Sequence, residues 1–81
     1  MTRVSNIATG LYRHYKGGLY HVFGTGIHSE TLEKYVIYQC VSSGSTWLRP
    51  MEMFMSSLKH ENHTVKRFSL ITRFENVNST K

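Results

Sequence analysis

Hydrophobic and aromatic positions occur along this chain in short runs that alternate with basic or hydroxyl side chains. Alternation of period two is typical of half-buried β-strands, whereas an amphipathic helix repeats every three to four residues. The pattern predicts five short strands, over residues 11–16, 19–24, 35–41, 46–49 and 65–71, with polar segments at 28–34 and 59–64. The run Tyr35-Val36-Ile37-Tyr38 carries the strongest strand signal because it joins β-branched and aromatic side chains.

Turn-forming residues indicate how these strands connect. Gly17-Gly18 separates the first two runs and predicts a two-residue hairpin turn, since glycine accepts positive φ at both central positions. The glycines of segment 24–26 predict a bulge or bend inside the second run. Pro50 ends the fourth strand because proline has no N–H to donate. It also opens a short helical turn that carries Met51 and Phe54.

Short strands with one helical turn before the last of them are typical of a small all-β barrel. We therefore expect an SH3-like barrel over residues 10–71, with a flexible arm at 1–9 and a flexible tail at 72–81; an OB-type barrel is the alternative. A chain of 81 residues has a small core. The pattern assigns that core to Tyr20, Val22, Val36, Tyr38, Leu48, Phe54 and Phe68, with Met51 filling gaps.

The charge balance points to anionic partners. Ten Lys and Arg residues face five acidic residues, none of them Asp, and the formal net charge is +5. Such a field raises the local concentration of nucleic acids or acidic proteins. Cys40 is the only cysteine, so no internal disulfide is expected, and we find neither a signal peptide nor a membrane span in the sequence. A cytoplasmic protein without membrane contact is the expectation.

Basic and aromatic side chains interleave at two places that neighbour each other in an SH3-like barrel. We predict one binding surface from Arg13, His14, Tyr15 and Lys16 beside the first turn, and Trp47 and Arg49 in the fourth strand. The favoured function is a non-enzymatic binding module that holds an acidic protein or peptide segment in an aromatic-lined groove. The alternative is single-stranded nucleic acid, with phosphates on the cations and bases stacked on the aromatic rings.

A second alternative is a small hydrolase-like enzyme that uses His28 and Glu30, because the segment 28–31 groups an imidazole, two hydroxyls and a carboxylate. Neighbouring residues rarely bring a nucleophile and its base within hydrogen-bonding reach. The pair also lacks the Pro-Cys-x-x-Cys half of the zinc deaminase signature. His60 and His63 supply two imidazoles, where a structural zinc site needs four ligands. We expect no catalytic residue, metal or cofactor, and we place His28 and Glu30 in the binding surface.

Three ordered blocks resemble a known family. They are GLYRHYKGG at 10–18 with Tyr20 and Val22, HSET at 28–31, and WLRP at 47–50 with Met53-Phe54. A chain with these blocks is similar to a family of small, mostly bacterial domains of unknown function, although the turn between Tyr38 and Trp47 is shorter and richer in Ser than is usual there. The resemblance spans about residues 10–71 and implies a compact β-barrel of unassigned activity.

Overall fold

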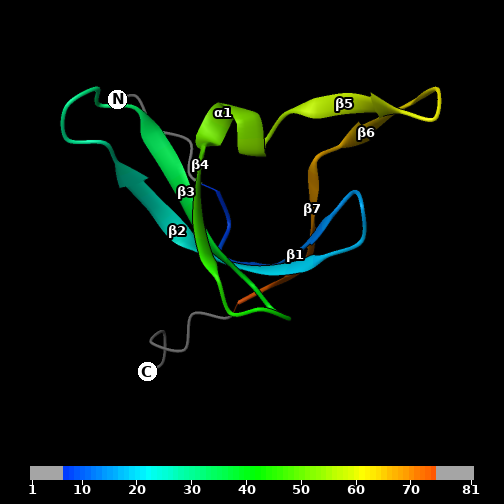
Figure 1. The fold of residues 1–81 in the computed structure, drawn as a ribbon, viewed down its shortest axis with the longest axis horizontal. Helices are drawn as coiled ribbons and strands as arrows, with labels where there is room; N and C mark the ends of the chain where they lie inside the picture. Colours follow the sequence, from blue (N-terminus) through cyan, green and yellow to red (C-terminus); the bar gives the residue numbers. More distant parts are fainter. Residues whose placement is uncertain (1–6, 75–81) are drawn as a thin grey trace.

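The computed structural model describes residues 7–74, which form seven strands and one helical turn (Figure 1). The elements are β1 (Gly10–His14), β2 (Leu19–Ile27), β3 (Lys34–Cys40), β4 (Thr46–Pro50), α1 (Met51–Phe54), β5 (Ser57–His60), β6 (His63–Lys66) and β7 (Phe68–Arg73). The mostly-β prediction is confirmed, as are the strand ending at Pro50 and the helical turn after it. Among these residues, no helix is long and apolar enough to cross a membrane. Parts of the predicted arm and tail, 1–6 and 75–81, lie outside the described residues.

The strands form two antiparallel sheets, and within residues 7–74 they do not close into the barrel that the sequence predicts. Five antiparallel strands follow the order β4-β3-β2-β1-β7, and β5 and β6 make a separate two-stranded sheet. Within residues 7–74, β4 and β7 are the two edges of the larger sheet and do not pair with each other. Figure 1 shows that this sheet is strongly curved and that the β5–β6 hairpin projects away from it.

The β1–β2 connection differs from the predicted Gly17-Gly18 turn. Its loop is 15–17: the Gly17 N–H donates to the His14 carbonyl at 2.7 Å, and the His14 N–H donates to the Gly18 carbonyl at 2.8 Å. Of the two glycines, only Gly17 has a positive φ, at 109°. A three-residue hairpin loop needs a positive φ at its last residue, and Gly17 supplies it. The loop therefore also includes Tyr15 and Lys16, which the predicted two-residue turn would leave in the first strand.

A two-residue turn of the predicted kind occurs instead between β5 and β6. Glu61 and Asn62 both have positive φ, 53° and 68°, and His60 pairs with His63 across them. The sequence predicts only a polar segment there, because Glu-Asn is a weak hairpin signal. The single last strand predicted over 65–71 is also wrong: it divides at Arg67 into β6 and β7. The Arg67 N–H donates to the Ser56 carbonyl, and the Arg67 carbonyl accepts from the Tyr15 N–H, both at 3.0 Å.

The core lies on one side of the five-stranded sheet. Its buried members are Tyr12, Val22, Val36, Tyr38, Phe54 and Phe68. Five of these were predicted, and Tyr20 and Met51 pack against the cluster while remaining partly exposed. Leu48 was predicted in the core and is wrong, since it is 64% exposed. Its position between Trp47 and Arg49 turns its side chain to the opposite side of β4.

We call the side of the sheet that carries the core the inner face, and the opposite side the outer face. Residues paired directly across two strands share a face. Trp47 pairs with Tyr38, and Arg49 pairs with Val36, so both lie on the inner face. Arg13 lies between two inner-face residues of β1 and therefore belongs to the outer face with Leu48.

Two glycines affect how the strands pair. The register shifts between Val22 and Gly24, which confirms a bulge in the glycine-containing part of the second strand. A Cβ on Gly10 would lie 2.3 Å from the Thr72 carbonyl, so the absence of a side chain lets β7 approach β1. As a result β7 continues past Ile71 to Arg73, and the Phe74 N–H donates to the Thr9 carbonyl.

Candidate functional site

A cleft of about 280 Å³ opens on the inner face where β1, β2, β3, β4 and β7 meet. Its lining consists of His14, Tyr20, Tyr38, Cys40, Ser43, Trp47, Arg49 and Phe68. Each of the five strands supplies at least one of these side chains. We call it the aromatic–arginine cleft, since four aromatic rings surround one guanidinium group.

Arg49 is held in a defined orientation. Its Nε donates to the Tyr38 hydroxyl at 3.0 Å, and its guanidinium carbon lies 5.8 Å from the centre of the Phe68 ring. Among the described residues, Tyr38 is its only hydrogen-bond partner, which leaves the two terminal nitrogens for an anion. Planar, two-point recognition of a carboxylate or phosphate is the chemistry that such an arginine performs best.

Aromatic rings form rigid walls beside Arg49. Tyr20 meets Tyr38 and Phe68 edge to face, at centre-to-centre distances of 5.4 and 5.6 Å. Tyr38 and Phe68 meet in the same way at 5.5 Å. Edge-to-face packing fixes each ring against its neighbours. Trp47 differs from them because it is 52% exposed, so part of its side chain is available to a ligand.

The electrostatic environment of the cleft is positive. Burial lowers the pKa of His14 below its ordinary value, and the cations Arg49, Arg67 and Lys16 lower it further. The His14 ring lies 4.9 Å from Phe68, and its Nδ1 accepts a hydrogen bond from the Lys16 N–H at 3.1 Å, which requires an unprotonated Nδ1. No carboxylate is present among the lining residues. The cleft therefore attracts anions through arginine and lysine while His14 stays neutral.

Cys40 adds a reactive group to the same cleft, and sequence reasoning missed it. Hydrogen bonds from Ser42 and Ser43 lower the pKa of its thiol to about 7, and the Cys40 Sγ lies 3.4 Å from the Ser42 Oγ. A larger fraction of this thiol is therefore ionised at neutral pH than of an ordinary cysteine. The only signal in the sequence was the pair Ser42-Ser43, two residues after Cys40. This pair predicts a turn, but it does not show that the two serines form hydrogen bonds to the Cys40 sulfur.

Only part of the predicted binding surface comes together. His14, Trp47 and Arg49 line the aromatic–arginine cleft. Tyr15 and Lys16 lie in the adjacent β1–β2 loop, where the Lys16 ammonium is 5.8 Å from the Tyr15 ring centre and Tyr15 meets His60 edge to face at 5.2 Å. The structure places Arg13 on the outer face, away from the cleft. Three further lining residues had been assigned to the core, namely Tyr20, Tyr38 and Phe68.

His28 and Glu30 lie in the β2–β3 loop, outside the aromatic–arginine cleft. The His28 Nδ1 accepts from the N–H groups of Glu30 and Thr31 at 3.2 Å, so this imidazole caps its own loop. The ring also lines an apolar groove with residues such as Ile27 and Leu48. Within residues 7–74, no group of three or more His, Cys, Asp or Glu side chains lies close enough to hold a metal ion.

Comparisons with known proteins agree with this architecture. A crystal structure of a DUF1653 protein from Bordetella bronchiseptica is similar, with a TM-score of 0.77 at 23% sequence identity, over 86% of this chain and 94% of that one. This likeness shows a shared fold. No curated protein sequence matches the chain. The sequence profile of the family described as "Protein of unknown function (DUF1653)" matches residues 10–70. The chain therefore belongs to the DUF1653 family.

Proposed function

We propose that this protein is a non-enzymatic binding module whose aromatic–arginine cleft recognises an acidic segment of another protein. The observation that carries the proposal is the geometry of Arg49, held by Tyr38 and Phe68 with its terminal nitrogens unused among the described residues. A group oriented before binding loses little side-chain entropy when the ligand arrives. A glutamate or aspartate carboxylate matches its two-point geometry.

Charge supports an acidic partner. The chain carries +5 overall, and three cations act on His14 at the cleft itself. The described carboxylates, Glu30, Glu33, Glu52 and Glu61, are all exposed and lie outside the lining of the cleft. An acidic segment thus meets attraction without competition from a neighbouring carboxylate.

The position of β4 supports an extended ligand. Within the described residues β4 is an edge strand, so the N–H and C=O groups along its free edge have no partner strand. A peptide that adds a strand at such an edge presents alternate side chains to the inner face. Trp47 and Arg49 project from β4 on that face, and they match one apolar and one acidic side chain of the peptide.

Single-stranded nucleic acid is the second candidate, and the exposure of Trp47 beside Arg49 favours it. A base stacks on an open indole face while a phosphate binds the arginine. The two candidates differ in their salt dependence, because a nucleic acid releases condensed counterions when its phosphates are neutralised. Affinity for a peptide with few charges falls less steeply as salt is added.

Trp47 is the only tryptophan, so its fluorescence reports occupation of the cleft directly. We would titrate the protein with a short peptide that repeats Val-Ser-Glu-Ser, which places Val and Glu on one face of a strand, with a matched Val-Ser-Lys-Ser peptide, and with oligothymidylate, at low and physiological salt. The proposal expects saturable quenching or shift by the acidic peptide and none by the basic one. Tighter binding of oligothymidylate with a steep salt dependence would favour the nucleic-acid alternative.

Two arginines provide a matched pair of variants. Arg49→Gln removes the cation from the cleft and should weaken acidic-peptide binding by about tenfold to a hundredfold, because a charge-assisted pair contributes about 1.5–3 kcal/mol. Arg13→Gln removes the same charge from the outer face and should leave the affinity nearly unchanged. Equal losses in the two variants would indicate unspecific attraction by the net charge. Thermal unfolding of both variants separates lost binding from lost structure.

A further inference from the structure

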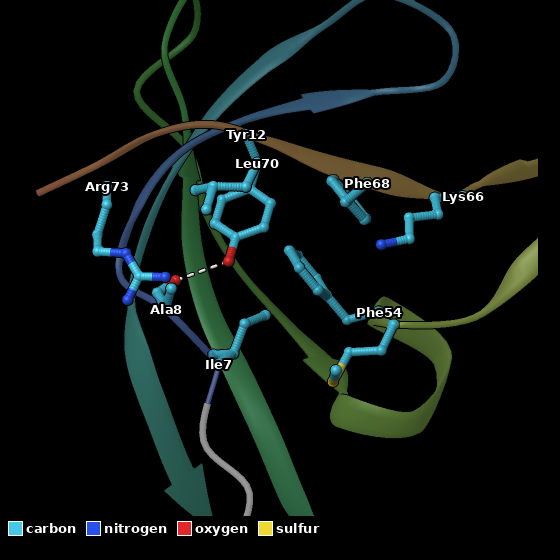
Figure 2. A pocket seen from close by; sticks show the side chains of 9 residues that line it. Ile7, Ala8, Tyr12, Phe54, Lys66, Phe68, Leu70 and Arg73 are labelled. Carbon is cyan, nitrogen blue, oxygen red and sulfur yellow. Dashed lines mark hydrogen bonds between the residues drawn. The ribbon is translucent and has the colours of Figure 1, made fainter.

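A second and larger cleft, of about 500 Å³, lies between β1, β7 and α1 (Figure 2). Aromatic rings form its floor. Phe54 and Phe68 stack in parallel with their ring centres 4.0 Å apart and an interplanar angle of 4°, and Tyr12 meets Phe54 edge to face at 5.5 Å. Since all three residues are buried in the core, this floor is rigid. We call this second site the amphipathic cleft.

Apolar side chains that remain partly exposed form the walls above the floor. Leu70 is 41% exposed and Met55 is 55% exposed, although both border the cleft. Ile7 also borders the cleft and is partly buried against the core. A hydrocarbon group placed here removes apolar surface from water without any rearrangement of the floor.

Two cations border the same cleft at opposite ends. Figure 2 shows Arg73 on one side and Lys66 on the other, with Tyr12, Leu70 and Phe68 between them. The residues that line the cleft include no carboxylate. Burial raises the pKa of Tyr12, and the positive charge of Arg73 opposes that rise. The guanidinium charge is therefore felt at the Tyr12 side of the cleft. Its apolar middle is therefore flanked by positive charge on both sides.

The Tyr12 hydroxyl has no proton to donate to an anionic ligand. It donates its proton to the Ala8 carbonyl at 2.7 Å, a bond that is visible in Figure 2. Its oxygen is then left as an acceptor only, beside Arg73. An anionic group at this end is bound by the guanidinium and not by the hydroxyl.

From this arrangement we infer that the amphipathic cleft binds a small organic dianion with an apolar middle, of the class of the α,ω-dicarboxylates. One carboxylate pairs with Arg73, the hydrocarbon chain covers Leu70 and the aromatic floor, and the second carboxylate pairs with Lys66. A monocarboxylate leaves one cation without a partner. An inorganic anion leaves the apolar walls in water. This site is separate from the aromatic–arginine cleft and goes beyond the function proposed for it.

Calorimetric titration of the full chain with suberate (octanedioate) tests this inference, with octanoate and inorganic phosphate as comparison ligands. Saturable one-to-one binding of suberate is expected, with weaker binding of octanoate and no saturable binding of phosphate. Amide NMR shifts that follow suberate should centre on Ala8 and Leu70, which border the cleft. Equal affinities for suberate and octanoate would show that the cleft does not recognise a second carboxylate. Absence of suberate binding would show that the cleft does not bind this class of ligand.

Three lysine and arginine variants locate the charges. Lys66→Gln and Arg73→Gln should each weaken suberate binding about tenfold, as expected when one charge-assisted pair is lost. Lys59→Gln removes an equally exposed lysine from β5, outside the lining of the cleft, and should leave binding unchanged. A loss in Lys59→Gln as large as in the other two would reduce the effect to general attraction and would overturn the inference. Unfolding temperatures equal to that of the original protein show that each variant is folded.

Discussion

The inner and outer faces of the five-stranded sheet use the same residue types for different purposes. Arg49 on the inner face is fixed by Tyr38 and Phe68, whereas Arg13 on the outer face is exposed. Phe54 packs on the inner side and is 1% exposed, whereas Leu48 is 64% exposed on the outer side. The difference teaches that one position along a strand decides whether a cation or an apolar group becomes part of a site, because only the inner face is covered.

Phe68 shows how the inner face acquires two sites instead of one. It lines both clefts, stacked on Phe54 toward the amphipathic cleft and facing Arg49 in the aromatic–arginine cleft. A single buried ring thus serves as a shared wall. The outer face carries a separate apolar groove, lined by residues such as Ile37 and Leu48.

The largest contrast between the faces is expected in stability. Phe54→Ala removes a buried ring and should lower the free energy of unfolding by about 3–5 kcal/mol. Leu48→Ala should lower it by about 0.5 kcal/mol or less, since its side chain is already exposed. Urea denaturation of both variants measures the difference. Comparable losses would contradict the assignment of the two faces.

A pair of tyrosines provides a second test. Tyr38→Phe removes the hydroxyl that accepts from the Arg49 Nε and should cost about 1 kcal/mol of unfolding free energy. Tyr35→Phe removes the hydroxyl that donates to Glu33 at 3.3 Å in an exposed bond and should cost close to nothing. Thermal unfolding compares them. A larger loss of stability in Tyr35→Phe than in Tyr38→Phe would show that the hydrogen bond between Tyr38 and Arg49 does not stabilise the fold.

The pH dependence of stability should reveal His14. Its folded-state pKa lies below the ordinary 6.5, so in that interval the unfolded chain binds the extra proton. Stability should therefore fall as the pH drops through about 6.5, and this contribution stops changing below the folded-state pKa. His14→Gln should flatten this part of a plot of Tm against pH.

Two cation variants serve as controls for the cause of the His14 shift. Lys16→Gln removes one of the charges that lower its pKa and should flatten the same plot in part. Arg13 is not among those charges, so Arg13→Gln should leave the shape of the plot unchanged. An identical slope in the original protein and in His14→Gln would contradict the role given to His14.

The smallest effect concerns Cys40. Its alkylation by iodoacetamide should rise with pH around a midpoint of about 7, since hydrogen bonds from Ser42 and Ser43 lower the pKa of the thiol. Ser42→Ala should move that midpoint upward, whereas Ser29→Ala in the β2–β3 loop should not. A midpoint near the ordinary 9.0 in the original protein would show that the two serines do not act on the sulfur.

Local elements were predictable where one residue dictates one conformation. Pro50 ends β4 as expected, because its missing N–H acts regardless of the surroundings. It precedes α1 as the N-cap, and the helical turn itself begins at Met51. The Glu61-Asn62 turn was not predictable, since these residues adopt positive φ only where the pairing of β5 with β6 requires it. The predicted barrel does not close for a related reason: β5 and β6 pair only with each other, which leaves β4 and β7 as the edges of the larger sheet.

The candidate site was predictable only in part. Alternation along β1 shows that Arg13 and His14 point to opposite sides, but it does not say which of the two sides is covered. Both sides carry basic and aromatic residues, so the pattern allowed one broad surface where the structure has a cleft that excludes Arg13. Cys40 was missed because the hydrogen bonds to its sulfur come from the turn that follows it.

The sequence by itself determined the net charge, the period-two alternation of the strands, and the bends and strand ends at glycine and proline. Each of these is a property of single residues or of near neighbours. Only the tertiary structure decided which face is inner, that the Arg49 Nε reaches the Tyr38 hydroxyl, and that Phe68 separates two clefts. These features depend on strand order and register, which join residues far apart in the chain. Contacts of that kind form only when the whole sheet assembles, and so no local pattern encodes them.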